Sequence, residues 1–310
     1  MGTVSTMQPR IIRRDDFAAY LAETEPQHKV IPASSFLADL KRRLFSPEQR
    51  NDGVLPWAKT HHDFQFRPGE VTLWAGINGH GKSMMLSMAM ISLMAQNRRC
   101  CIASFEMKPV VQLERMVRQM TMGDSPTEEW VDLTCAWLND KLWFYDQQGT
   151  VDTKAVYAIC KYAAERLDVE HVVIDSLMKC VRGEDDYNGQ KALVDELTAI
   201  ARDTGLHIHL VHHVRKGSDE NSPPGKFDAR GAASITDQVD NVLIVWRNKG
   251  KEAKARAGKD FDDREPDALL LCEKQRNGEW EGAVRLWFHK GSMQYTPDDD
   301  CRPMDLMRLG

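Results

Sequence analysis

Short apolar runs alternate with longer amphipathic stretches over most of the chain, from about residue 70 onward. Short runs rich in apolar and β-branched residues are typical of buried strands, whereas apolar positions three and four residues apart are typical of helices. On this basis strands are predicted at 70–76, 100–106, 142–146, 171–177, 207–214, 241–248, 268–276 and 283–290, and helices at 82–96, 109–120, 127–138, 153–167 and 190–203.

This order of elements predicts an α/β fold, in which a mostly parallel sheet has helices on both faces. The last two predicted strands have no helix between them, so we expect a C-terminal β-hairpin at the sheet edge. Two segments are poor in apolar residues: 215–231, predicted to be a long mobile loop, and 248–267, predicted to be a solvated surface loop.

The first sixty residues differ from the rest, because they are polar and interrupted by prolines. Residues 34–46 read as one short amphipathic helix. Such a helix can fold onto its own domain, or it can be a linker that docks on a neighbouring subunit, and both interpretations remain open. The predicted division is an N-terminal extension with a linker helix (1–60), a main α/β domain (61–298) and a C-terminal tail (299–310). The apolar face of the helix is formed by Phe36, Leu37, Leu40 and Leu44.

Composition places the 310-residue chain among ordinary globular proteins, with 42% hydrophobic and 28% charged residues. No run of apolar residues is long enough to predict a membrane span. The seven cysteines include no CxxC pair, which argues against a zinc site or a disulfide framework and favours reduced thiols in a cytosol. A net charge of −5 argues against a surface coated with positive charge, but it leaves room for local basic loops that bind nucleic acid.

One short segment, GINGHGKS at residues 76–83, fits the phosphate-loop pattern GxxxxGK[ST]. Its context also fits, because a buried strand precedes it and a helix follows. Backbone N–H groups at the helix N-terminus can surround phosphates, Lys82 can reach the β- and γ-phosphates, and the Ser83 hydroxyl can ligate Mg²⁺. The methionine-rich helix that follows is apolar all round and is interpreted as core. The predicted nucleotide contacts in this segment are Gly76, Asn78, Gly79, His80, Gly81, Lys82, Ser83 and Met84.

Two acidic residues end two of the predicted strands, Asp175 after HVVI and Glu106 after CCIASF. In a parallel sheet the carboxyl ends of the strands line the ligand crevice. Asp175 is therefore predicted to organise Mg²⁺, and Glu106 to orient and deprotonate an attacking water. Each acid could instead cap the helix that follows it.

Taken together and in order, five segments resemble the motifs of the DnaB-like replicative helicases of the RecA superfamily, closest in style to phage primase-helicases and the mitochondrial replicative helicase. A sixth, EKQRNG at 273–278, looks like the segment that supplies trans-acting fingers. The resemblance covers roughly residues 55–296 and implies a RecA-like P-loop NTPase core. The five segments are GINGHGKS (76–83), SFEM (104–107), VVIDSL (172–177), LVHHVRK (210–216) and FDARGAASITDQVDNVLIVWRN (227–248).

The resemblance assigns roles around a nucleotide site that holds ATP, or another NTP, with Mg²⁺. Lys82 and Ser83 bind phosphate and metal, Glu106 is the general base, and Asp175 organises the metal. His213 is expected to sense the γ-phosphate, since adjacent strand residues face opposite ways and only one of His212 and His213 can face the nucleotide. Lys274 and Arg276 are expected to enter the site of the neighbouring subunit in a ring of six, and Arg247 is expected to pack on the base.

The family function would be an ATP-dependent replicative DNA helicase that forms a homo-oligomeric ring around single-stranded DNA, with a primase or loader as a possible partner. A cytoplasmic location is expected, in a bacterium or a phage-infected host. Alternatives are a RecA- or KaiC-like DNA-dependent or regulatory ATPase, or a loader-type ATPase without unwinding. We find no room for a primase or a helical collar, so ring assembly is expected to rest on the ATPase domain and linker helix. The predicted DNA contacts are Lys179, Arg182, Arg215, Lys216, Lys226, Arg230, Gly231 and Ala232.

Overall fold

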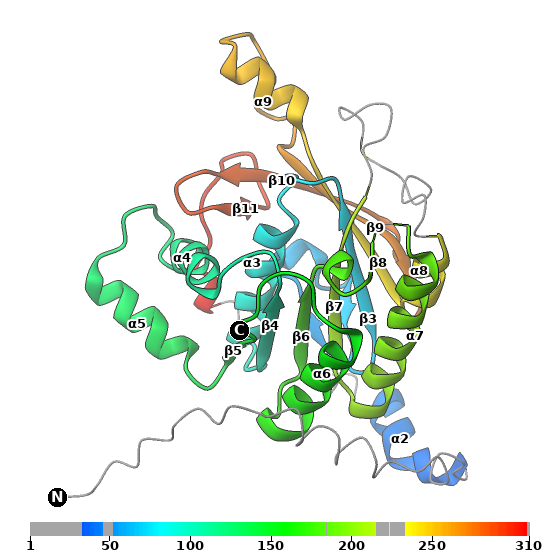
Figure 1. The fold of residues 1–310 in the computed structure, drawn as a ribbon. Coiled ribbons are helices and arrows are strands. Elements are labelled where there is room, and N and C mark those ends of the chain that lie inside the picture. Colours follow the sequence, from blue (N-terminus) through cyan, green and yellow to red (C-terminus); the bar gives the residue numbers. More distant parts are fainter. Residues whose placement is uncertain (1–32, 46–51, 184, 215–222, 224–232, 309–310) are drawn as a thin grey trace, which may run out of the picture. The chain divides into compact units, whose positions relative to one another are not determined.

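A computed structural model of the chain describes residues 33–45, 52–183, 185–214, 223 and 233–308 (Figure 1). The chain divides into two units, Met1–Arg50 and Asn51–Gly310. None of the helices within these described ranges is long and apolar enough to cross a membrane.

The described part of the first unit is a single helical segment, formed by the 3₁₀ turn η2 (Ala33–Phe36) and helix α2 (Leu37–Phe45). It lies where a helix was predicted at 34–46. Its apolar side chains are exposed, namely Leu37, Leu40, Leu44 and Phe45.

The second unit is built on a nine-stranded sheet whose spatial order is β11-β10-β9-β8-β3-β7-β6-β4-β5. The six strands from β8 to β5 in this order are parallel to one another, and β9, β10 and β11 are antiparallel to their neighbours. The strands are β3 (Val71–Gly76), β4 (Cys100–Ser104), β5 (Leu142–Phe144), β6 (His171–Asp175), β7 (His207–His213), β8 (Asn241–Arg247), β9 (Ala268–Gln275), β10 (Gly282–His289) and β11 (Gln294–Thr296).

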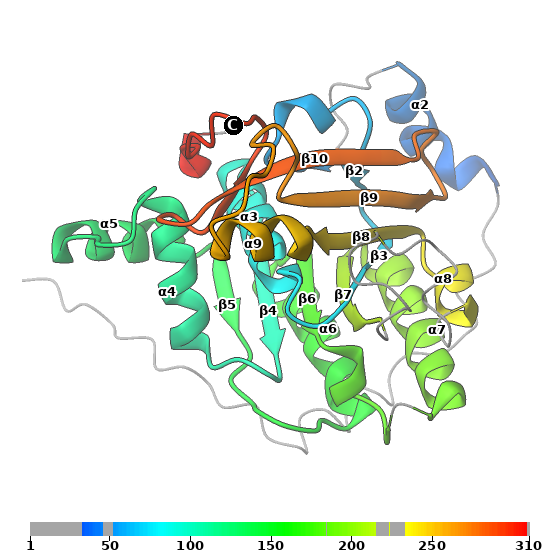
Figure 2. The same ribbon diagram turned by 90° about the horizontal axis from the view of Figure 1, so that it is seen from above.

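Helices cover both faces of this sheet (Figures 1 and 2). Successive residues of a strand point to opposite faces, so Leu73 and Ile174 join one core with α6 and α7, whereas Trp74 and Val173 join another with α3. Strands covered on both faces must be apolar on both, which explains their continuous apolar runs. The helices are α3 (Lys82–Ala95), α4 (Pro109–Met120), α5 (Glu128–Leu138), α6 (Thr153–Leu167), α7 (Tyr187–Thr204), α8 (Ala233–Gln238) and α9 (Lys249–Arg256), with 3₁₀ turns η4 (Ala58–Thr60), η5 (Leu177–Lys179) and η6 (Leu306–Arg308).

The predicted fold class is confirmed, and the strands and helices predicted from residue 70 onward are all present. The core unit begins earlier than the predicted boundary at 61, because a small ribbon of β1 (Gly53–Val54) and β2 (Gln65–Phe66) belongs to it. The Phe66 side chain is fully buried with α3, as are those of Trp57 and Phe64. The tail is also part of the core, since Leu306 is fully buried against the same cluster.

Two predictions for the C-terminal third were wrong. The hairpin of β9 and β10 does not form the sheet edge, because the short strand β11 pairs outside it. The segment 248–267 is not only a solvated loop, because it contains α9. This helix is polar all round and therefore gave no apolar periodicity; the Asn248 side chain caps it by accepting from the Lys251 N–H at 2.9 Å.

Candidate active site

The phosphate-loop segment joins the carboxyl end of β3 to the start of α3. Two of its glycines have no room for a side chain. A Cβ at Gly76 would lie 2.5 Å from the Val245 carbonyl oxygen, and one at Gly81, where φ is +89°, would collide with the Tyr295 hydroxyl. The loop is thereby pressed against β8 and β11, and its backbone N–H groups are left at the helix N-terminus, where they suit an anion.

Lys82 folds back over this loop. Its Nζ donates to the carbonyl oxygens of Gly76 at 2.8 Å and Ile77 at 3.0 Å, and the side chain is buried. Burial lowers the pKa of the ammonium to about 8, against the opposing effects of Asp175 and Glu106. A buried cation with a third donor to offer is the group expected beneath the β- and γ-phosphates.

Ser83 and Asp175 form a pair of oxygen ligands beside the loop. The Ser83 hydroxyl donates to Asp175 Oδ2 at 2.9 Å, and the carboxylate is buried at the end of β6. Burial raises the pKa of Asp175, partly offset by the Ser83 hydrogen bond. Mg²⁺ takes few protein oxygens and keeps several waters, so one hydroxyl and one carboxylate fit a Mg²⁺–nucleotide complex.

Glu106 follows β4 and lies next to β6, since Phe105 N–H donates to the Asp175 carbonyl oxygen at 2.7 Å. Its Oε1 accepts from Ser176 Oγ at 2.8 Å and lies 3.4 Å from His213 Nε2. The hydrogen bond with His213 is the main cause that lowers the pKa of Glu106 to about 2, against the effect of burial. Glu106 is thus an ionised carboxylate beside the Ser83–Asp175 pair.

Of the two histidines that end β7, His213 is the one that faces Glu106. Across the sheet it pairs in register with Gly76, the last residue of β3 before the loop. Its other ring nitrogen, Nδ1, is buried and makes no hydrogen bond within the described part of the chain. His212 is buried, and burial lowers its pKa to about 4. His213 therefore occupies the position expected of a residue between base and phosphate.

Lys274 and Arg276 lie at the other end of the parallel strands, where β8 begins and not where the phosphate loop follows β3. Strand β9 runs antiparallel to β8, and Gln275 pairs with Asn241, the first residue of β8. Both side chains bind carbonyl oxygens of α8 and the turn after it: Lys274 Nζ contacts those of Thr236 (2.8 Å), Asp237 (3.0 Å) and Val239 (2.8 Å), and Arg276 Nη2 those of Asp237 and Gln238 (both 3.2 Å).

The length of β3 separates these two cations from the loop of their own chain. Arg276 N–H donates to the Asp240 carbonyl oxygen, and Asp240 N–H to the carbonyl oxygen of Val71, the first residue of β3. The loop begins five residues later, at Gly76, which corresponds to about 17 Å at roughly 3.3 Å per residue. Arg276 therefore lies at the opposite end of the strands from the phosphate loop of its own chain and cannot reach it.

A protein-family model described as AAA domain matches residues 58–219, more than half of the chain, including the phosphate loop, Glu106, Asp175 and His213. The chain belongs to this AAA domain family. Among solved structures, one of an ATPase domain on its own is similar, with 14% identity, a TM-score of 0.72, and 86% of this chain and 99% of that chain covered. A DnaB-like replicative helicase, described with its primase interactions, has 14% identity and a TM-score of 0.68, with 91% and 71% covered. At these identities the likeness shows the fold, which is that of the ATPase domains of DnaB-like helicases.

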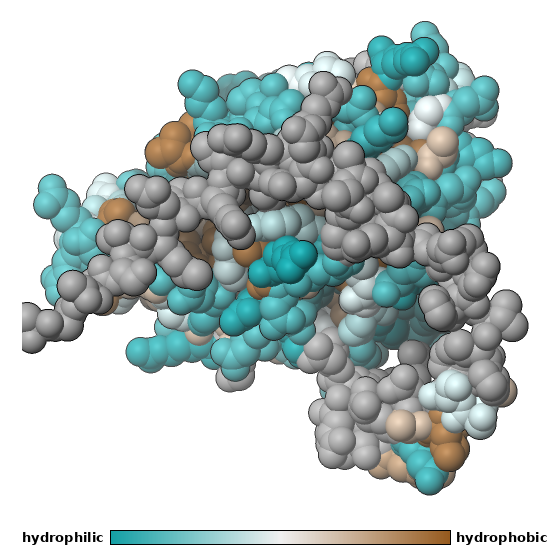
Figure 3. Space-filling model, turned by 60° about the horizontal axis from the view of Figure 1, so that its bottom comes forward, coloured by the Kyte–Doolittle hydropathy of each residue, from teal (hydrophilic) through white to brown (hydrophobic). Residues whose placement is uncertain are grey.

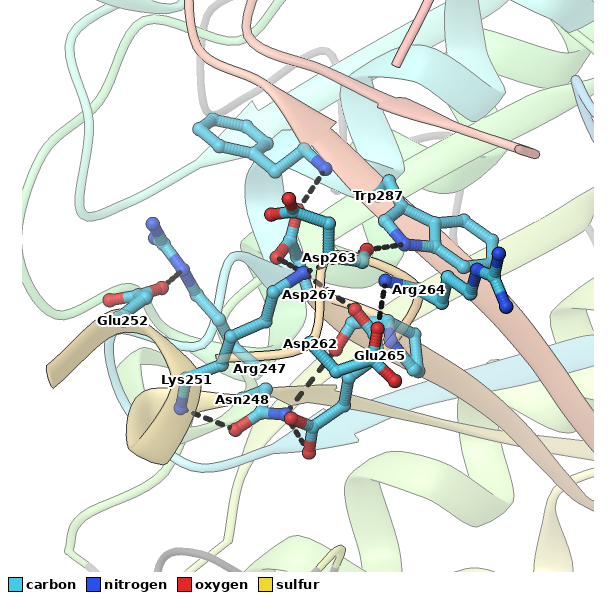
Figure 4. A network of polar contacts seen from close by, with 12 residues as sticks. Arg247, Asn248, Lys251, Glu252, Asp262, Asp263, Arg264, Glu265, Asp267 and Trp287 are labelled. Atoms are coloured by element: carbon cyan, nitrogen blue, oxygen red, sulfur yellow. Dashed lines mark hydrogen bonds and ion pairs between the residues drawn. The ribbon is translucent and has the colours of Figure 1, made fainter. Parts of the chain in front are cut away.

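Beyond the part of the chain that the AAA domain model matches, Arg247 ends β8 and points toward Glu252 of α9 (Figure 4). Its guanidinium lies over the Phe288 ring at 5.1 Å and forms an ion pair with Glu252 of α9. Its backbone N–H donates to His80 Nδ1 at 3.1 Å, which ties the loop to β8.

The segment after β8 is held by a polar network (Figure 4). Lys251 Nζ lies 2.8 Å from Asp267 Oδ1 and donates to the Glu265 carbonyl oxygen at 2.6 Å, and Asn248 Nδ2 donates to Glu265 Oε1 at 2.9 Å. Asp267 Oδ2 also accepts from the Phe288 N–H at 2.8 Å. The same carboxylate therefore holds α9 through Lys251 and fixes the backbone of Phe288, whose ring lies against Arg247.

Among the residues predicted to bind DNA, two are described. Lys179 ends η5, directly after β6, and Arg182 is exposed just beyond it. Both follow the same strand end as Asp175. The remaining predicted DNA contacts lie outside the described residues: Arg215, Lys216, Lys226, Arg230, Gly231 and Ala232.

The sequence prediction missed three residues of this site. Ser176 could have been found, because it directly follows Asp175 at a strand end. Phe288 and Glu252 carried no local signal, since they approach Arg247 from β10 and α9 only in the folded chain.

Proposed function

We propose that the chain is a subunit of a ring-shaped, ATP-driven DNA helicase, which hydrolyses ATP between subunits and translocates on single-stranded DNA. The observation that carries this proposal is the division of the catalytic groups between two edges of one sheet. The phosphate loop, Glu106, Asp175 and His213 meet at the carboxyl edge of the parallel strands, and Arg276 lies at the other. Two half-sites on opposite sides of one subunit are completed by head-to-tail assembly, which forms a ring when the rotation between subunits closes.

The half-site at the carboxyl edge is suited to hydrolysis by water. Glu106 Oε1 is engaged by Ser176 and His213, which leaves Oε2 to accept a proton from the attacking water. Lys82 moves from its own loop carbonyls to the phosphates. Ser83 and Asp175 would hold Mg²⁺, which would offset the negative charge of the phosphates when bound. Arg276 from the next subunit supplies the charge that the transferred phosphoryl group still lacks.

The nucleotide base has a fitting place beside the Arg247–Phe288 pair. A guanidinium and an aromatic ring present two flat faces on which a purine can stack. The ion pair with Glu252 fixes the direction of the guanidinium. Such stacking is tolerant of base identity, so it fits ATP and other nucleoside triphosphates alike.

Ring assembly is proposed to use α2 of one copy and α5 of another. Helix α2 exposes Leu40 and Leu44, and α5 exposes Trp130 and Leu133. The sequences of the two helices have opposite charge, which favours their pairing. Helix α2 carries the basic residues Lys41, Arg42 and Arg43 and one acid, Asp39, and α5 carries the acids Glu128, Glu129 and Asp132. A hexamer is the proposed ring, with a primase or loader as a possible further partner.

The face seen in Figure 3 is turned toward the bottom of the Figure 1 view, and its described surface is mainly hydrophilic, with small separate hydrophobic patches. DNA contact is proposed for Lys179 and Arg182 and for the predicted basic residues between 215 and 232. Phosphate contacts of this kind give little sequence specificity.

Unwinding of forked DNA with ATP tests the proposal. The wild-type protein is expected to unwind, whereas Lys82→Ala and Arg276→Ala are expected to lose unwinding, and DNA should stimulate hydrolysis. Hydrolysis and DNA stimulation without unwinding would favour the RecA- or KaiC-like alternative. Hydrolysis that depends on another protein and not on DNA would favour a loader.

A further inference from the structure

Ser176 directly follows the metal-binding acid Asp175, and its hydroxyl has a different partner. It donates to Glu106 Oε1 at 2.8 Å, whereas the Asp175 carboxylate accepts from Ser83. Ser176 is the first residue after β6, which ends at Asp175, so two consecutive residues of the chain reach two separate parts of the site. Asp175 pairs with Ser83 at the proposed metal site, and Ser176 binds Glu106, the proposed base.

The position of Ser176 is fixed by its surroundings. It is completely buried, with 0% of its surface exposed. Its carbonyl oxygen accepts from the Lys179 N–H at 3.0 Å and from Cys180 Sγ at 3.5 Å, so η5 holds its backbone. A short side chain with one rotatable bond in such a place offers its hydroxyl at a nearly constant point.

The two partners of Glu106 Oε1 differ in how firmly they are held. Ser176 is completely buried, whereas the His213 side chain is 26% exposed. The Glu106 side chain that they share is 36% exposed. His213 also ends β7, and it must leave Glu106 if it turns toward a γ-phosphate. A glutamate that lost both partners would be free to rotate about three bonds, and water activation needs a fixed carboxylate.

We infer that Ser176 is a positioning residue, which holds Oε1 of Glu106 so that Oε2 keeps facing the attacking water after His213 has turned to the nucleotide. This inference rests on the proposed hydrolysis at the same site. The hydroxyl also favours the ionised carboxylate, because it donates to the charged form. After His213 it is the second hydrogen bond that lowers the pKa of Glu106.

Steady-state ATP hydrolysis by Ser176→Ala and Ser176→Thr, measured across pH in the full-length chain, tests the inference. Ser176→Ala is expected to lower kcat about 10-fold and to leave the KM for ATP unchanged, because the interaction acts only on the chemical step. The acid limb of its kcat–pH profile should move to higher pH, since Glu106 loses a hydrogen bond that lowers its pKa. Ser176→Thr keeps the hydroxyl and should restore both rate and profile.

Two further variants separate positioning from simple stability. Ser176→Cys keeps the volume but offers only a weak donor, so it should resemble Ser176→Ala even if the alanine variant folds poorly. In a Glu106→Gln background, Ser176→Ala should change the residual rate by less than about 2-fold, since no base is left to position. Ser92→Ala, which removes a buried serine hydroxyl on α3 that pairs with Gln96 at 3.1 Å, is the matched control and should keep the wild-type rate and profile.

The inference is overturned if both Ser176→Ala and Ser176→Cys keep the wild-type kcat and pH profile. It is equally overturned if Ser176→Ala costs the same factor with and without Glu106. Failure of the proposed function is a different result, because the wild-type chain would then show no hydrolysis that Lys82→Ala abolishes.

Discussion

Arg276 Nη1 lies 3.0 Å from Asp240 Oδ1, in an ion pair whose acid is buried and whose base is 38% exposed. The other oxygen of the same carboxylate accepts from the Val71 N–H at 3.0 Å. Asp240 therefore joins the proposed finger to the first residue of the central strand. Since Nη2 also donates to the carbonyl oxygens of Asp237 and Gln238, the Nε side of this exposed guanidinium is what its described contacts leave for a neighbour.

Removal of that acid should cost stability. Asp240→Ala leaves the buried Val71 N–H without its partner, so the free energy of unfolding is expected to fall by about 1–3 kcal/mol. Urea denaturation followed by circular dichroism measures it. Asp237→Ala is the matched control, because the contacts of Asp237 with Lys274 and Arg276 use its carbonyl oxygen. Equal stability of the Asp240→Ala and wild-type proteins would contradict the described anchor.

His213 should matter for turnover more than for ATP binding. His213→Ala removes the ring that contacts Glu106 and, in the proposed function, senses the γ-phosphate; kcat is expected to fall about 10–100-fold with little change in KM. DNA stimulation of the remaining activity should also be lost. His62→Ala, at an exposed histidine of the same chain, should behave as wild type. A His213→Ala variant with normal kcat and normal DNA stimulation would exclude the sensing role.

The sequence was informative where one segment carries its own signal. The phosphate loop, the acid at each strand end and the apolar strands are local patterns. The described structure places the loop and the two acids together at the carboxyl ends of the parallel strands. The sequence could not reveal contacts between distant segments, such as Phe288 beneath Arg247 or Ser176 on Glu106. Helix α9 escaped prediction because polar contacts, rather than an apolar face, hold it.

Arg247 should contribute to nucleotide affinity. If the base stacks at the Arg247–Phe288 pair, Arg247→Ala should raise the KM for ATP about 10-fold while kcat stays near wild type, because uniform binding is lost. Arg285→Ala is a matched control, since Arg285 lies over the Trp287 ring of the same strand, at 5.7 Å. An unchanged KM for Arg247→Ala would place the base elsewhere.

Three buried histidines near the amino edge of the sheet should make folding sensitive to acid. His209 Nδ1 accepts from Trp74 Nε1 at 3.2 Å, so its proton is on Nε2, which is 3.2 Å from His171 Nδ1. Protonation of His171 at Nδ1 would place its N–H directly against the N–H of His209 Nε2. Burial is the main cause that lowers the pKa of all three, to about 4 for His207 and well below the usual value for His171 and His209.

The sign follows from proton linkage. Below about pH 6.5 the unfolded chain binds protons that the folded chain excludes, so stability is full above that pH and is lost as the pH falls toward 4. Urea denaturation at several pH values should show this slope. His207→Gln should reduce it by up to about 1.4 kcal/mol per pH unit, one proton's worth, whereas His62→Gln should not. A slope unaffected by His207→Gln would contradict neutral burial.

The proposed division of the catalytic groups between two chains is tested most directly by mixing two variants that are each expected to be inactive. Lys82→Ala lacks a working phosphate loop but keeps its finger, and Arg276→Ala has the reverse defect. In a random 1:1 ring about a quarter of the interfaces combine an intact loop with an intact finger, so ATP hydrolysis should recover toward roughly a quarter of the wild-type rate. If instead every mixing ratio gives only the weighted average of the two parents, Arg276 does not act in the site of a neighbouring subunit.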